Sequence, residues 1–201
     1  ESTQTALLQY LPPNASIYIE GCKLFTVPEF YKYFKKGKIP EGYLNDLSTD
    51  EIDMLFNAII SFQNKEILSL NVFLELAKKY EDLPYENVKV RFNSLLRSGS
   101  LYKLALTREP QLQNKLGEIY FTIANLLQDN SSQDFSPSIN LDLLLEKRNS
   151  FRYVLQLRDE LLKASFHYGN LEAGYQLALL YRDGKYSNGG SFMAPSPDKV
   201  S

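Results

Sequence analysis

The stretch that most constrains the fold of this chain lies near its end, between Ala164 and Gly184. Gly169 can supply the positive φ with which many helices end. Asn170 can then cap a second helix, with Glu172 in its first turn, where the helix dipole favours an anion. Apolar or small residues before the turn recur at helical spacing at Val154, Leu155, Leu157, Leu161, Leu162 and Ser165. After the turn, one face carries Ala173, Leu177, Leu180 and Tyr181. The stretch therefore predicts two short antiparallel helices.

Two short helices cannot bury both of their faces alone, so they need stacked neighbours. The small, apolar and turn-forming residues of this stretch resemble the signature of the Sel1-like repeat, a short relative of the tetratricopeptide repeat. The matching residues are Ala164, Gly169, Ala173, Leu177, Ala178, Tyr181 and Gly184. The resemblance covers about one repeat, residues 159–186. It implies an all-α fold in which antiparallel helix pairs stack as an α-solenoid.

A loop rich in Ser, Gly and Pro follows the hairpin, from Ser187 to Pro197. Pro197, Asp198 and Lys199 then look like the first turn of another helix, which breaks off at Ser201. We therefore expect residues 140–201 to form a Sel1-like hairpin with the start of a further repeat, in a solenoid truncated at its C-terminus. A frayed tail is the alternative.

Residues 1–139 are expected to form a divergent helical N-terminal region. Ser48 to Glu51 is a capping box, and it opens a helix with an apolar face of Ile52, Leu55, Phe56, Ile59 and Ile60. Residues 65–80 predict the next helix, with Ile67, Leu70, Leu74 and Ala77 aligned. A third helix is expected to start at Pro84 and to end at Gly99, with a short helical segment over residues 100–106.

The most regular helix is predicted over residues 109–128, with an apolar stripe of Leu112, Leu116, Ile119, Tyr120, Ile123 and Leu127. Gly117 lies inside it and either weakens it locally or marks a close helix contact. Residues 129–138 form a polar stretch that we expect to be a hinge or cleavage site. Asn140 can cap the next helix, which is expected to start at Leu141.

Composition narrows the function classes. The net charge of −2 and pI near 5.6 argue against a dedicated nucleic-acid binder. The single cysteine cannot form an internal disulfide, and no apolar run is long enough to span a bilayer. We expect an intracellular, cytoplasmic protein. Mitochondria or the ER lumen are the alternatives. Two glycosylation sequons, at Asn14 and Asn130, support the ER lumen only weakly, because chance alone would give about two.

No set of residues suited to catalysis is recognisable. The one histidine, His167, and the one cysteine, Cys22, are far apart in sequence, and a nucleophilic pair also needs a third, orienting group. A zinc site draws three or four ligands, which this chain does not offer at ligand-like spacing. We therefore expect no catalytic residues, no metal site and no cofactor. His167 is expected to cap carbonyls at a helix end or to be exposed.

One surface segment stands out, residues 30–38, which read FYKYFKKGK. Its candidate partner-binding residues are Tyr31, Tyr33, Lys35 and Lys36. Interleaved aromatics and lysines can stack on bases and pair with phosphates. They can equally form a half-buried helix whose C-terminal lysines complement the dipole.

The resemblance implies a non-enzymatic scaffold or adaptor that binds a protein partner or a multi-protein complex through its helical surface. Tyr and Arg are the expected anchors of such a surface. The alternative is an RNA-associated helical-repeat protein, in an organelle or elsewhere, that uses residues 30–38.

Replacing Lys32, Lys35, Lys36 and Lys38 by Gln separates these alternatives. If these lysines contact phosphates, single-stranded RNA binds the wild type with a steep salt dependence, and the variant binds weakly with a flatter salt slope. We expect instead that the lysines only complement the dipole of a half-buried helix. The variant should then change the free energy of unfolding by about 0.3–1 kcal/mol per contributing charge and should leave partner binding intact. Fluorescence anisotropy at several salt concentrations measures the first effect. Micromolar RNA binding at physiological salt that the variant loses would favour the RNA-binding alternative.

Overall fold

The computed structural model describes residues 43–61, 69–129, 135, 137–145 and 154–182. Over these residues the chain is helical and contains no strand, which confirms the expected all-α class for this part. The chain divides into two compact units, residues 1–79 and 80–201. The boundary expected after residue 139 therefore falls within the second unit.

In the first unit, a short 3-10 helix η1 (Tyr43–Asn45) precedes α4 (Thr49–Ser61) and most of α5 (Leu70–Asp82). The N-cap of the predicted capping box is confirmed, because Ser48 Oγ accepts from the Glu51 backbone N–H at 3.2 Å. The Glu51 carboxylate accepts from the Ser48 hydroxyl at 3.1 Å, and not from the Ser48 backbone N–H as in the full motif. The predicted apolar face of α4 is buried at Ile52, Leu55, Phe56 and Ile59, whereas Ile60 is half-buried.

The predicted face of α5 is wrong in part. Its buried residues are Val72, Phe73, Leu76, Ala77 and Tyr80, whereas Leu70 and Leu74 are only half-buried. Residue 67 lies outside the described part. Apolar residues occur around much of this helix, so more than one stripe fits the helical period, and the residues packed around it determine which stripe is buried.

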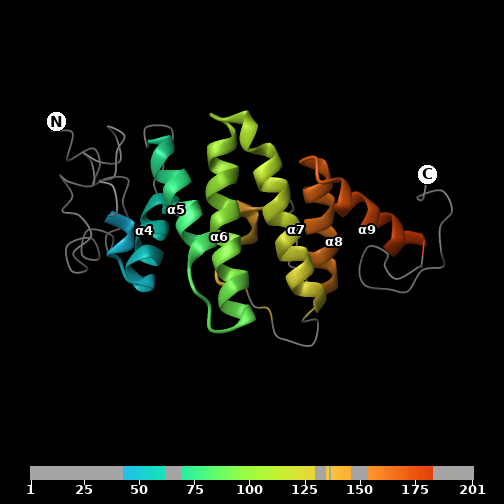
Figure 1. The fold of residues 1–201 in the computed structure, drawn as a ribbon, viewed down its shortest axis with the longest axis horizontal. Coiled ribbons are helices and arrows are strands. Elements are labelled where there is room, and N and C mark those ends of the chain that lie inside the picture. The colour runs from blue at the N-terminus through green and yellow to red at the C-terminus, as the bar shows by residue number, and fades with distance from the viewer. Residues whose placement is uncertain (1–42, 62–68, 130–134, 136, 146–153, 183–201) are drawn as a thin grey trace. The chain divides into compact units, whose positions relative to one another are not determined.

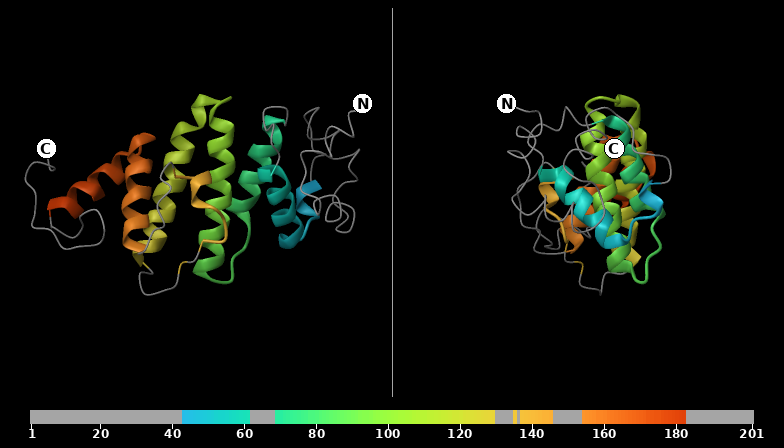
Figure 2. Two further views of the ribbon diagram at one scale, coloured as in Figure 1. Left: turned by 180° about the vertical axis from the view of Figure 1, so that it is seen from behind. Right: turned by 90° about the vertical axis from the view of Figure 1, so that its left-hand side faces the viewer.

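The second unit contains α6 (Val88–Leu106), η3 (Pro110–Leu112), α7 (Gln113–Asp129), η4 (Leu141–Leu143), α8 (Val154–His167) and α9 (Leu171–Arg182). Figure 1 shows α6, α7 and α8 side by side with alternating directions, and the reverse view in Figure 2 shows the same order. The most extensive helix contacts join α6 to α7, α7 to α8, and α8 to α9.

The helix α6 differs from expectation at both ends. It begins at Val88 and not at Pro84, because Asn87 caps it by accepting from the Val90 N–H at 3.0 Å. It also continues through Gly99 to Leu106. Gly99 does not end the helix but lets it approach neighbouring side chains, since a Cβ there would lie 2.8 Å from Leu144 Cδ1.

The helix predicted over residues 109–128 is confirmed as η3 followed by α7, and five residues of its six-residue stripe are buried; Leu112 is half-buried. Asn140 caps the next element as expected, but that element is the single 3-10 turn η4. The expected hinge at residues 129–138 is anchored at two described points. The ring of Phe135 packs edge-on against Phe92 at 5.2 Å, and the Ser138 N–H donates to Asn93 Oδ1 at 2.7 Å.

The helices α7 and α8 make the most extensive contact in the second unit. A Cβ at Gly117 of α7 would lie 3.1 Å from the Tyr168 carbonyl oxygen and 3.3 Å from that of Ser165. The Ser165 hydroxyl donates to the Gly117 carbonyl at 2.7 Å, and this hydrogen bond is buried. Gly117 thus marks a close helix contact, which was one of its two expected roles.

A polar cluster joins the last residues of α5 to α6 and α7 within the second unit. The Tyr102 hydroxyl donates to Glu81 Oε1 at 2.6 Å, and Lys115 Nζ pairs with Glu81 Oε2 at 2.7 Å. Burial, this hydrogen bond and the charges of Glu81 and Asp82 raise the pKa of Tyr102 above its ordinary value. The phenol is therefore a stable donor in the folded protein.

The Gly117→Val variant tests the crossing of α7 and α8. We expect it to lower the free energy of unfolding by about 1–3 kcal/mol or more, because the added methyl groups meet backbone oxygens that cannot turn aside. Thr122→Val is the matched control, since it places the same residue at an exposed position of α7 and is expected to change stability by less than about 0.5 kcal/mol. Urea unfolding measures both. If Gly117→Val and Thr122→Val have equal free energies of unfolding, the close crossing of α7 and α8 is contradicted.

Candidate functional site

The turn between α8 and α9 forms as its sequence predicts. Gly169 has a φ of +94°, its N–H donates to the Phe166 carbonyl at 2.9 Å, and the Asn170 N–H donates to the Ser165 carbonyl at 3.1 Å. This pair of hydrogen bonds is the Schellman arrangement at a helix C-terminus. The Asn170 side chain also accepts from the Ala173 N–H at 3.1 Å, so one residue follows α8 and caps α9.

The residues that resemble the repeat signature have different environments. Ala173 is completely buried and Leu177 is buried, whereas Ala164, Ala178 and Tyr181 are half-buried. Gly169 makes the turn, and Gly184 lies outside the described residues. The buried face of α9 is therefore narrower than the predicted one, because Leu180 and Tyr181 retain exposure.

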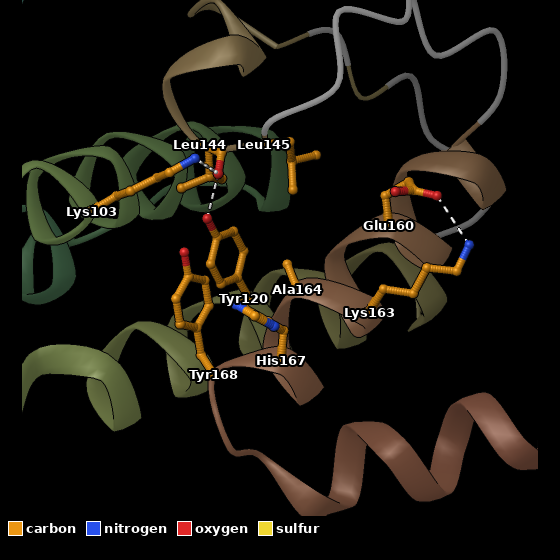
Figure 3. Close-up of a pocket in the computed structure, with 9 residues that line it drawn as sticks. All are labelled: Lys103, Tyr120, Leu144, Leu145, Glu160, Lys163, Ala164, His167 and Tyr168. Carbon is orange, nitrogen blue, oxygen red and sulfur yellow. Dashed lines mark hydrogen bonds and ion pairs between the residues drawn. The ribbon is translucent and has the colours of Figure 1, made fainter. Parts of the chain in front are cut away.

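A cavity of about 330 Å³ lies in the second unit among α6, α7, α8 and the segment after η4 (Figure 3). Its apolar lining consists of Leu144, Leu145 and Ala164. The first two are buried, and Ala164 is half-buried. The cavity is at the small end of the range of about 300–1,000 Å³ that is usual for ligand pockets.

Aromatic rings form a second part of the lining. Tyr120 and Tyr168 stack with ring centroids 5.6 Å apart and planes within 2° of parallel. His167 packs edge-on against Tyr168 at 5.1 Å, and it is exposed, as expected for a histidine at a helix end. Figure 3 shows the two tyrosine rings next to each other, with His167 beyond them.

Both signs of charge are present in the lining, as Lys103, Lys163 and Glu160. Lys163 pairs with Glu160 at 3.0 Å and with Asp159. Burial alone would lower the pKa of Lys163, but the hydrogen bonds and charges of the two carboxylates outweigh it, so its pKa is raised and the ammonium group stays charged. The ion pair is local to α8.

The backbone carbonyl group of Leu144, on the apolar side of the cavity, accepts two side-chain hydrogen bonds. Lys103 Nζ donates to it at 2.9 Å, and the Tyr120 hydroxyl donates to it as well (Figure 3). Because Leu144 is 1% exposed, these side chains replace the water that its carbonyl oxygen would otherwise bind. The two donors fix the segment after η4 against α6 and α7.

Sequence reasoning did not predict this cavity. Its lining comes from residues 103 to 168, and Leu144 and Leu145 were assigned only to a helix expected after Asn140. The candidate partner-binding residues Tyr31, Tyr33, Lys35 and Lys36 lie outside the described part, as does Cys22. Among the described residues, no three His, Cys, Asp or Glu side chains are grouped as metal ligands would be.

A second feature of the α8–α9 hairpin is a set of large apolar side chains left in solvent. Phe166, Leu171 and Tyr175 are 51%, 79% and 60% exposed. Leu171 and Tyr175 are four residues apart and therefore share a face of α9. The ring of Phe166 lies over Gly174, where a Cβ would come within 2.6 Å of it. We call these three residues the hairpin patch.

A double-mutant cycle tests the anchoring of the Leu144 carbonyl. Tyr120→Phe and Lys103→Met each leave one donor, so the double variant should lose about 0.5–2 kcal/mol more stability than the sum of the single losses. Tyr120→Phe combined with Lys115→Met is the control, because Lys115 pairs with Glu81 instead. That pair should be additive within about 0.5 kcal/mol. Additivity in both cycles, measured by urea unfolding, would refute the shared anchor.

Comparisons with models of protein families, with curated proteins and with solved structures found no match to this chain. The resemblance to the Sel1-like repeat is therefore carried by the signature residues alone. No helix in the described part of the chain combines the length and the apolar character needed to cross a membrane.

Proposed function

We propose that this protein is a non-enzymatic scaffold or adaptor. Its helices stack as a solenoid of the Sel1-like or tetratricopeptide-like kind and bind a protein partner through their surface. The observation that carries the proposal is the packing order of the second unit, in which the most extensive contacts join each helix to the next one along the chain. Repeat solenoids are built from such nearest-neighbour contacts, and they present extended surfaces for binding.

The hairpin patch supports a protein partner. Large exposed apolar side chains that gather in one part of a surface mark interaction sites in many proteins, and these three lie on the two helices of one hairpin. Tyr175 is of the type that most often dominates binding energy, and Arg182, seven residues further along α9, is exposed on the same face. A tyrosine flanked by leucine and arginine fits an interface centre with a charged rim.

Affinity capture with residues 1–201 as bait tests the proposal. The double variant Leu171→Ser/Tyr175→Ser removes two large side chains of the patch without touching buried residues. The amount of partner that this variant captures should fall by a factor of about ten or more. Loss of a tyrosine at the centre of an interface can cost about 2 kcal/mol of binding free energy or more. Quantitative mass spectrometry of the cross-linked, captured proteins measures the loss.

Tyr85→Ser is the matched control, because Tyr85 is 56% exposed and lies outside the hairpin. It should retain as much partner as the wild type. Equal losses in both variants would show that the patch is not the binding surface. A wild-type chain that retains no protein above the level of blocked resin would overturn the adaptor proposal itself.

A further inference from the structure

We propose that the cavity among α6, α7 and α8 is a recognition pocket for one uncharged, aromatic side chain of a protein partner. This inference rests on the proposed adaptor function, because the side chain is taken to belong to the bound protein. It adds what the hairpin patch does not supply, a concave site with a defined size and chemistry.

The size of the cavity favours a side chain over a larger ligand. At about 330 Å³ it has the volume of the smallest ligand pockets, which is too small to bury a dinucleotide or a comparable cofactor. The lining includes exposed His167 and the half-buried residues Ala164 and Tyr168, so the cavity reaches solvent. A side chain presented from a partner's surface can therefore enter it.

The apolar and aromatic parts of the lining favour an aromatic ring. Leu144, Leu145 and Ala164 offer hydrocarbon surface, and Tyr120 and Tyr168 offer two parallel rings on the same side. A further ring gains both apolar burial and an offset or edge-on contact, which aromatic pairs prefer at centroid distances of about 4.5–7 Å. A branched aliphatic side chain would gain the free energy of apolar burial but not the additional stabilisation of an aromatic pair.

The charges of the lining disfavour a charged side chain of either sign. The carboxylates of Glu160 and Asp159 already offset the charge of Lys163, and Lys103 binds the Leu144 carbonyl. The charged groups of the lining are Lys103, Lys163 and Glu160, and each of them is already paired or hydrogen-bonded, so an entering charge of either sign finds no partner that is reserved for it. Either one would also leave water for an apolar lining, which is costly without a dedicated partner.

Capped amino acids test the chemistry of the pocket directly. The N-acetyl amides of Phe, Leu, Glu, Lys and Gly share one backbone and differ only in the side chain. With leucine methyl groups labelled with ¹³C, we expect the Phe probe to shift the Leu144 and Leu145 signals saturably, with weaker shifts for Leu. The Glu, Lys and Gly probes should bind at least about tenfold more weakly. Equal or tighter binding of a charged probe, or no saturable shift with Phe, would overturn the inference.

The Ala164→Phe variant fills the pocket from its own lining and should abolish the shifts caused by the Phe probe. Ala178→Phe is the matched control, because Ala178 is also half-buried but does not line the cavity. It should retain probe binding. A thermal melt of each variant confirms that it is folded, and if Ala164→Phe is unfolded, Ala164→Met provides the smaller filling. Probe binding that survives a folded, filled variant would refute the assignment.

Partner capture separates the pocket from the adaptor proposal. If the folded Ala164→Phe chain retains as much partner as the wild type, the adaptor function stands and the pocket does not recognise that partner. A tenfold or greater loss, with Ala178→Phe unaffected, supports the pocket. If the wild type captures no protein, the adaptor proposal fails, and so does the assignment of a partner's side chain to this cavity.

Discussion

The crossing of α7 and α8 at Gly117 is the contact on which the rest of the second unit depends. A residue without Cβ lets the α7 backbone approach the last turn of α8, where the Tyr168 and Ser165 carbonyl groups face it. The buried hydrogen bond from the Ser165 hydroxyl to the Gly117 carbonyl joins a side chain of α8 to the α7 backbone at this point. With α7 and α8 held together, Tyr120 of α7 can stack on Tyr168 at the end of α8. One missing methyl group thus determines both the helix distance and one wall of the cavity.

The segment after η4 completes the cavity because side chains bind its buried Leu144 carbonyl, while the N–H groups of Leu144 and Leu145 donate to the Leu141 carbonyl. The carbonyl of Leu144 receives hydrogen bonds from one residue of α6 and one of α7, and the side chain of Leu144 lies against Gly99 of α6. An apolar segment can leave helical structure in a buried place only if its polar groups find such partners. The same contacts that satisfy the carbonyl therefore place Leu144 and Leu145 at the cavity.

The second unit has two features that could contact a partner. One is the cavity among α6, α7 and α8, and the other is the exposed hairpin patch of α8 and α9. The cavity draws its charged residues from α6 and α8, and its ion pair between Lys163 and Glu160 lies within α8, where the two charges cancel. The hairpin patch lies on both sides of the tight turn at Gly169, with Phe166 at the end of α8 and Leu171 and Tyr175 on α9. An adaptor with these two features would bind one partner through an apolar contact at the hairpin patch and would bind one side chain of that partner in the cavity. The two contributions are separable, because different residues make them.

The sequence by itself determined the features that depend on neighbouring residues in the chain. Ser48, Asn140, Gly169 and Asn170 cap or turn as predicted, because each interaction closes within a few residues. The helical class and the stripe of α7 followed for the same reason, since periodicity is a local property.

Only the tertiary structure decided what depended on distant partners. Gly99 fits the pattern of a helix end equally well, but the packing of Leu144 against it makes it a contact inside α6. The buried face of α5 and the cavity likewise required knowing which segments meet. A glycine or an apolar residue has the same local signal whether it turns the chain or fits a neighbour, and only the neighbour distinguishes the two.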